Sequence, residues 1–128
     1  MTSTLKINTL TGVSTAGSIA VTGEAGSTTT NLQQGLCKAW FNANGTGTAA
    51  TLNSFNISGI TDNSTGSLTH TFTNNFANVN LAVGLGMSAY SPNISSTAVG
   101  SITTLSANSS GSATDTAIHT ANLNGDLA

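Results

Sequence analysis

Alternation of large apolar and small polar side chains is the sequence feature that most restricts how this chain can fold. In Ser67–Thr73, Leu68, His70 and Phe72 fall on one face and hydroxyl residues on the other, which is typical of a half-buried strand. Leu81–Met87 alternates in the same way, with Ala and Gly on its bare face. Ser, Thr, Asn and Gly are poor helix formers, and sustained helical spacing of apolar residues is lacking. The pattern therefore predicts an all-β fold.

Further strands are expected wherever similar segments are bounded by clusters of Gly, Asn or Ser. They are predicted at Leu36–Ala43, Leu52–Ile60, Val99–Leu105 and Thr116–Leu123. Turns are predicted at Asn44–Gly47, Ile60–Gly66 and Ser106–Ser112, so that Leu52–Thr73 forms a hairpin. Thr29–Gln34 is the one place where a short helical turn fits. Short strands at this spacing indicate a small antiparallel β-sandwich or jelly-roll-like domain.

The first 30 residues differ from the rest of the chain. Their apolar side chains are scattered among Thr, Ser and Gly, and they are too few to close a core. We expect residues 1–30 to form an extended arm or stem, ordered by its own copies or by another protein. Residues 31–128 are predicted to form the β head domain, with the boundary near Asn31.

Charge is nearly absent from the 128 residues. Only 5% are charged, with two Lys or Arg and four Asp or Glu, and the net charge is −2. Nucleic-acid binding needs several cationic contacts to phosphates, so no nucleic-acid partner is expected. An apolar run of about 18 residues is missing, so no membrane insertion is expected either. A small core beneath a neutral surface suits a subunit of an assembly, in which burial between chains adds to burial within one.

His70 and His119 are the chain's two histidines, and each lies in a predicted strand. A hydrogen-bonded or interface role is favoured over metal ligation, because no Cys or carboxylate pattern accompanies them. In a trimer, a ring of three such side chains around the axis stays open as an alternative. Asp62 and Asp115 stand in turn contexts, where an aspartate commonly caps backbone N–H groups.

Catalytic sequence motifs are missing: there is no nucleophile elbow, phosphate-binding loop or zinc-binding helix. We therefore expect the protein not to be an enzyme and to hold no metal or cofactor. The single cysteine, Cys37, excludes a disulfide within the chain.

The large amphipathic aromatics are Trp40 and Tyr90. Trp40 lies within a predicted strand beside Phe41, which favours core packing or a subunit interface over ligand stacking. Tyr90, Pro92 and Asn93 are predicted to lie in a surface loop, where an aromatic ring and adaptable polar groups could contribute to receptor recognition. The alternative is that Tyr90 closes the edge of the core.

Several segments together resemble a known family. They are Leu36–Thr48, with its Lys-Ala-Trp and Gly-Thr-Gly motifs, Ser54–Gly66 and Leu68–Asn74, together with the opening Ser3–Leu10 and the ending Gly125–Ala128. They resemble small tail-fibre proteins of cyanobacterial and marine phages. The resemblance covers most of the chain and is weakest over Tyr90–Ser112.

The resemblance implies a virion protein, synthesised in the host cytoplasm, that forms a homotrimer. Its N-terminal arm would contact other virion proteins, and its head would bind a cell-surface glycan or other receptor during host attachment. A capsid decoration protein that stabilises the head of the virion is the alternative, because it too needs a neutral β trimer with an arm.

Overall fold

The computed structural model describes residues 4–13, 19–23, 26, 28–88 and 91–128. Their contacts divide the chain into two compact units, Met1–Leu36 and Cys37–Ala128. In the first unit, β1 (Ala20–Thr22) pairs with β2 (Thr29–Asn31), and α1 (Leu32–Gly35) follows at once. The Asn31 side chain accepts a hydrogen bond from Gln34 N at 3.0 Å and so caps the predicted helical turn.

The described residues of the first unit include none that is buried. This agrees with an apolar content too low for a core, although the hairpin was not anticipated. The predicted boundary near Asn31 falls inside this unit, because Asn31 pairs with Ala20 and caps α1.

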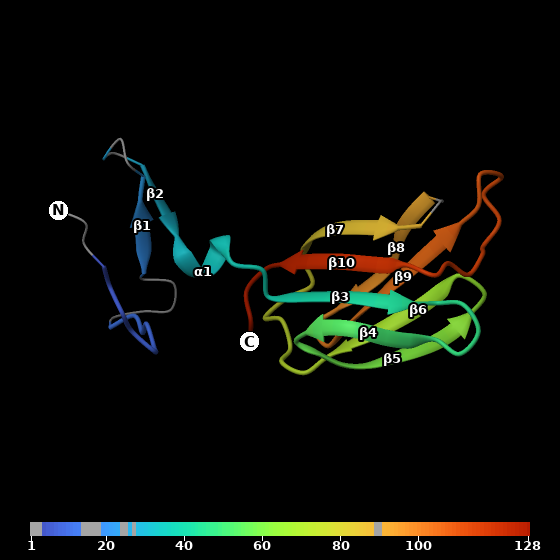
Figure 1. Ribbon diagram of the computed structural model, residues 1–128. Coiled ribbons are helices and arrows are strands. Elements are labelled where there is room, and N and C mark those ends of the chain that lie inside the picture. Colours follow the sequence, from blue (N-terminus) through green and yellow to red (C-terminus); the bar gives the residue numbers. More distant parts are fainter. Residues whose placement is uncertain (1–3, 14–18, 24–25, 27, 89–90) are drawn as a thin grey trace. The chain divides into compact units, whose positions relative to one another are not determined.

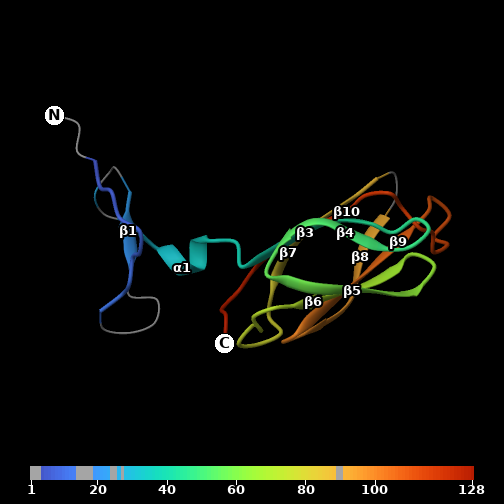
Figure 2. The same ribbon diagram turned by 60° about the horizontal axis from the view of Figure 1, so that its bottom comes forward.

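The second unit contains two four-stranded antiparallel sheets, so the all-β prediction with antiparallel strands is confirmed (Figure 1). The first sheet has the order β4-β3-β10-β7 and consists of β3 (Ala39–Asn44), β4 (Ala50–Phe55), β7 (Ala82–Met87) and β10 (His119–Asn124). The second sheet has the order β5-β6-β9-β8 and consists of β5 (Ile57–Ser64), β6 (Ser67–Phe72), β8 (Ser91–Ala98) and β9 (Ser101–Ala107). Figure 2 shows the two sheets as separate layers.

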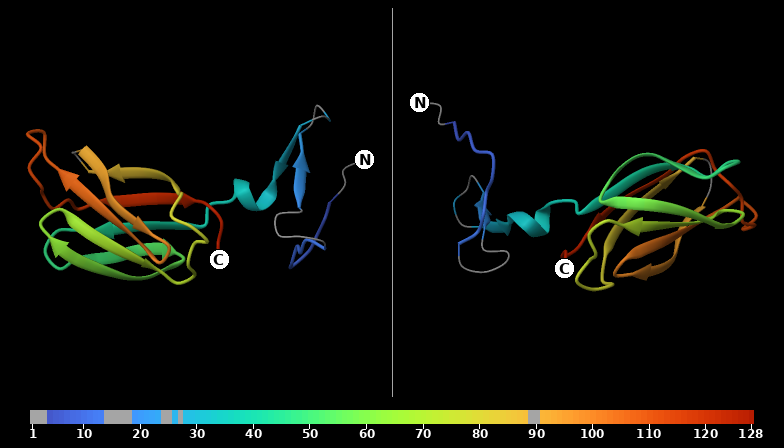
Figure 3. Two further views of the ribbon diagram at one scale, coloured as in Figure 1. Left: turned by 180° about the vertical axis from the view of Figure 1, so that it is seen from behind. Right: turned by 90° about the horizontal axis from the view of Figure 1, so that it is seen from below.

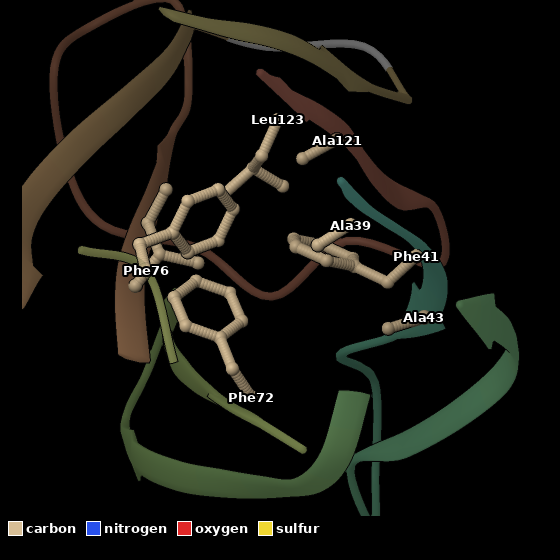
Figure 4. Packing of buried hydrophobic residues seen from close by; sticks show 8 residues of the cluster. Ala39, Phe41, Ala43, Phe72, Phe76, Ala121 and Leu123 are labelled. Carbon is tan, nitrogen blue, oxygen red and sulfur yellow. The ribbon is translucent and has the colours of Figure 1, made fainter. Parts of the chain in front are cut away.

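The core lies where the inner faces of the two sheets meet (Figure 4). It is built mainly from alternate residues of β3, β6, β9 and β10, and its buried members are Ala39, Phe41, Ala43, Phe72, Phe76, Ile102, Ala121 and Leu123. Phe72 and Phe76 meet edge to face, with ring centroids 4.9 Å apart. Alternation along each strand places the intervening side chains on the outer faces of the sheets.

One predicted strand, Leu52–Ile60, is wrong because the chain leaves the first sheet at Asn56 and enters the second. Asn56 has φ of 59°, a left-handed conformation that asparagine tolerates better than most residues. Its side chain accepts from Asn74 N at 2.7 Å and donates to Lys38 O at 3.1 Å. These bonds hold the corner, so β4 and β5 belong to different sheets.

The turn predicted at Ile60–Gly66 is also shorter than expected. β5 continues to Ser64, so Asp62 lies on a strand rather than in a turn. Gly66 has φ of 74°, and a Cβ there would meet Ser106 O, Thr114 N and Thr114 O at 2.5–2.9 Å. Only glycine fits this turn without displacing neighbouring backbone.

Candidate functional site

Two of the three residues predicted to bind a receptor, Pro92 and Asn93, do not lie in the expected loop. Pro92 and Asn93 lie in β8, opposite Ser106 and Leu105 of β9, so the predicted loop is wrong; Tyr90 lies outside the described residues. Strand β8 is at the edge of its sheet and needs hydrogen bonds on one side only, which is why it can contain a proline. Pro92 and Asn93 are both exposed, and their part in recognition stays a prediction.

Both histidines are fully buried inside the second unit, with exposed fractions of 0%. The His70 ring stacks on Phe41, with centroids 3.6 Å apart and planes 15° apart. Neither His70 ring nitrogen has a hydrogen-bond partner among the described residues. Burial within the single chain turns both side chains away from the surface, and the axial histidine ring of a trimer stays a prediction.

The environment of the two histidines keeps them neutral. Burial lowers the pKa of His70 to about 4, and repulsion from His119 acts in the same direction. Burial also lowers the pKa of His119, while attraction to the Asp115 carboxylate opposes that shift. Among the described residues, no group of three or more His, Cys, Asp or Glu side chains could hold a metal ion.

Asp115 and Ser106 make hydrogen bonds that connect the segments around His119. Asp115 Oδ1 accepts a hydrogen bond from Gly66 N at 2.6 Å, so this aspartate caps the backbone of a distant turn. Ser106 Oγ lies 3.5 Å from His119 Nε2, and Ser106 N donates to Gly66 O at 2.8 Å. These contacts join the β5–β6 turn to the segment that precedes β10, which is a structural role.

Trp40 is not a core residue, so the core-packing alternative is wrong for its side chain. It projects from the outer face of β3 and is 37% exposed. Its partner across the β3–β4 ladder is Phe55, which is 52% exposed. Directly opposite residues of an antiparallel pair share one face of the sheet. Trp40 and Phe55 therefore form an aromatic pair on the outer face of the first sheet.

Polar side chains continue this outer face. Asn42 lies opposite Asn53 of β4 on one side and opposite Thr120 of β10 on the other. Trp40 likewise lies between Phe55 and Asn122. We call the six residues Trp40, Asn42, Asn53, Phe55, Thr120 and Asn122 the aromatic–amide face.

An open groove of about 470 Å³ adjoins this face between the edge strands β4 and β5. It is lined by residues 51–54 and 57–60, which mix Thr, Asn and Ser with Leu and Ile. Asn53 belongs both to this groove and to the aromatic–amide face. This groove is therefore neutral and partly apolar.

Sequence reasoning missed the aromatic–amide face because it considered Trp40 without a cross-strand partner. Phe55 and Asn53 lie in a segment predicted as one long strand, and the register that places them beside β3 is a property of the sheet. The available signal was the alternation in β3, where Trp40 and Asn42 fall between the small or buried residues Ala39, Phe41 and Ala43.

Comparisons with protein-family models, with curated proteins and with solved structures give no match for this chain. Among the described residues, no helix has the length and apolar character needed to cross a membrane.

Proposed function

We propose that the protein is a phage tail-fibre or fibre-tip subunit that takes part in host attachment by binding cell-surface glycan. In this proposal the head is a β-sandwich, the N-terminal arm joins other virion proteins, and three copies form the working unit. The role is binding and structural, with no catalytic step. The proposal rests on the resemblance described above and on the surface chemistry of the second unit.

The observation that carries the proposal is the neutral outer face of the first sheet. Its four strands contain no Asp, Glu, Lys or Arg, and the exposed side chains there are amides, hydroxyls, two aromatic rings, the aliphatic Leu52 and alanines. Hydroxyl-rich ligands can be held by such amide and hydroxyl groups, which both donate and accept hydrogen bonds. Three weak sites in a trimer would be strengthened by avidity.

The segments that carry the resemblance also lie at places that build the head. Lys38-Ala39-Trp40 opens β3, and Ser54-Phe55-Asn56 leads to the corner between the sheets.

Locating the protein on intact virions by cryo-electron microscopy tests the proposal directly. Density for the protein at the tail, together with blocking of phage adsorption by the purified protein, is the expected result. Density over the capsid shell would instead support the decoration alternative. Light scattering at micromolar concentration tests the trimer, since a monomeric mass would contradict it.

A further inference from the structure

We propose that the aromatic–amide face is the glycan site of the head, and that it takes a neutral saccharide. This inference rests on the proposed function and moves its binding site from Pro92 and Asn93 on β8 to Trp40 and Phe55 on the first sheet. Strand register, side-chain chemistry, packing and charge support it.

Strand register brings the six residues into two parallel rows. One row runs Phe55, Trp40 and Asn122, and the next runs Asn53, Asn42 and Thr120. Neighbouring strands lie about 4.8 Å apart, and alternate residues of one strand about 7 Å apart. An aromatic pair is therefore bordered by an amide pair at a spacing comparable to one sugar ring.

The chemistry of the two rows matches the two kinds of surface that a sugar presents. The axial C–H groups of a sugar ring make an apolar patch that can lie on an aromatic face, while its hydroxyls need both donors and acceptors. Trp40 and Phe55 supply exposed apolar area at little cost in conformational entropy. Asn53 is exposed, and its Oδ1 accepts from Ser54 N at 2.9 Å, which holds the amide in place.

Packing against β7 orders the third strand of the face. The Asn122 carboxamide lies over Gly84, where an added Cβ would meet its Oδ1. Thr120 Oγ1 donates to Gly86 O at 3.0 Å. These two side chains are therefore held before any ligand arrives, which reduces the entropy lost on binding. Asn42 Oδ1 is covered by its neighbours and has no hydrogen-bond partner among the described residues, so it is not among the acceptors that the face presents.

The charge of the face selects the ligand class. The four strands have no Asp, Glu, Lys or Arg, and their one histidine, His119, is buried on the opposite face and kept neutral. An acidic glycan would find no cation among the side chains of these four strands to compensate the loss of hydration of its carboxylate or sulfate groups. Lys38, one residue before β3, is the cation nearest to Trp40 in the sequence, and it already takes part in another interaction. A neutral saccharide avoids that cost.

Trp40 offers a direct readout because it is the only tryptophan of the chain. Full-length protein is applied to a printed array of neutral and acidic glycans, and the strongest binder is titrated in solution while tryptophan emission is followed. We expect neutral glycans to bind and to shift the Trp40 emission. Phe55→Ala, which keeps the reporter, is expected to weaken binding by about tenfold or more, the effect of removing a central aromatic contact.

Matched variants separate binding from folding. Trp40→Ala is expected to lose array binding, and Trp40→Phe to retain part of it. Val99→Ala changes an exposed aliphatic residue beyond the first sheet and is expected to bind like the unchanged protein. Circular dichroism melts of every variant show whether the head remains folded.

The outcomes distinguish this inference from the proposed function. Unchanged binding by folded Phe55→Ala and Trp40→Ala variants would overturn the site and leave glycan-dependent attachment in place. Preference for acidic glycans, or no binding to any glycan, would overturn the ligand assignment. Loss of binding in both variants, combined with a capsid location on virions, would support the site and overturn the fibre role.

Discussion

The outer faces of the two sheets are made from similar small polar residues but arrange them differently. On the second sheet, Asn63 Nδ2 donates to Thr69 Oγ1 at 2.9 Å, and the Thr69 and Thr103 hydroxyls are hydrogen-bonded at 2.8 Å. Figure 3 includes a view of the domain from behind, toward this sheet. On the first sheet, Trp40 and Phe55 face outward instead. Side chains that hydrogen-bond to one another stabilise the outer face of the second sheet. On the first sheet the exposed aromatic rings lie beside amides, which is the combination that the proposed glycan site uses.

The largest expected effect separates the inner and outer faces of the first sheet. Phe41→Ala removes the ring stacked on His70 and opens a cavity in the core, so it is expected to lower the free energy of unfolding by about 3–5 kcal/mol. Phe55→Ala removes a half-exposed ring and is expected to cost less than about 1 kcal/mol. Chemical denaturation of both variants measures the difference. Equal losses would contradict the assignment of faces.

A smaller effect is the loss of stability at low pH. It arises from His70 of the second sheet, which stacks on Phe41 of the first. In the unfolded chain His70 titrates near 6.5, whereas in the native state its pKa is about 4. Above pH 6.5 neither state binds the proton, so the full stability is present. As the pH falls from 6.5 toward 4, only the unfolded state gains the proton, and stability falls by about 3 kcal/mol in total. Below pH 4 this contribution stops changing.

His119 adds a loss in the same direction, because its pKa is also lowered. His70→Leu supplies the control. This variant replaces a buried ring whose nitrogens make no hydrogen bond among the described residues with an apolar side chain. The free energy of unfolding at pH 7 is therefore expected to change little or to rise. Its unfolding free energy should depend less steeply on pH between 6.5 and 4. A dependence as steep as in the unchanged protein would assign the acid sensitivity to other groups.

The smallest expected effect compares the two outer faces themselves. Thr103→Val removes one hydroxyl from the Asn63–Thr69–Thr103 chain and is expected to cost about 0.5–1.5 kcal/mol. Asn53→Ala on the first sheet is expected to change stability by less than about 0.5 kcal/mol. Thermal melts of the two variants test this order. A larger loss from Asn53→Ala would mean that the aromatic–amide face also contributes to stability.

Prediction from the sequence succeeded where a local pattern is sufficient. Alternation in Ser67–Thr73 predicts a strand with Leu68, His70 and Phe72 turned inward; β6 spans Ser67–Phe72, and all three side chains are buried. It failed at β8, because Ser91, Pro92 and Asn93 are turn-forming residues that an edge strand tolerates when one neighbour supplies the hydrogen bonds.

The candidate site was predictable only in part. Trp40 was singled out, but its exposure and its pairing with Phe55 depend on the register between β3 and β4. Directly after Phe55, the side chain of Asn56 donates to backbone carbonyls 18 positions away on both sides. Contacts over such separations leave no periodic trace in the sequence.

The sequence by itself determined the all-β character and the neutral surface, because strand periodicity and charge are properties of single residues and their neighbours. The tertiary structure decided which sheet each strand joins, which aromatic ring is exposed and why the histidines remain neutral. The physical reason is that burial and cross-strand pairing arise only when distant segments meet. His70 shows this most clearly, since burial in the packed core and repulsion from His119 lower its pKa.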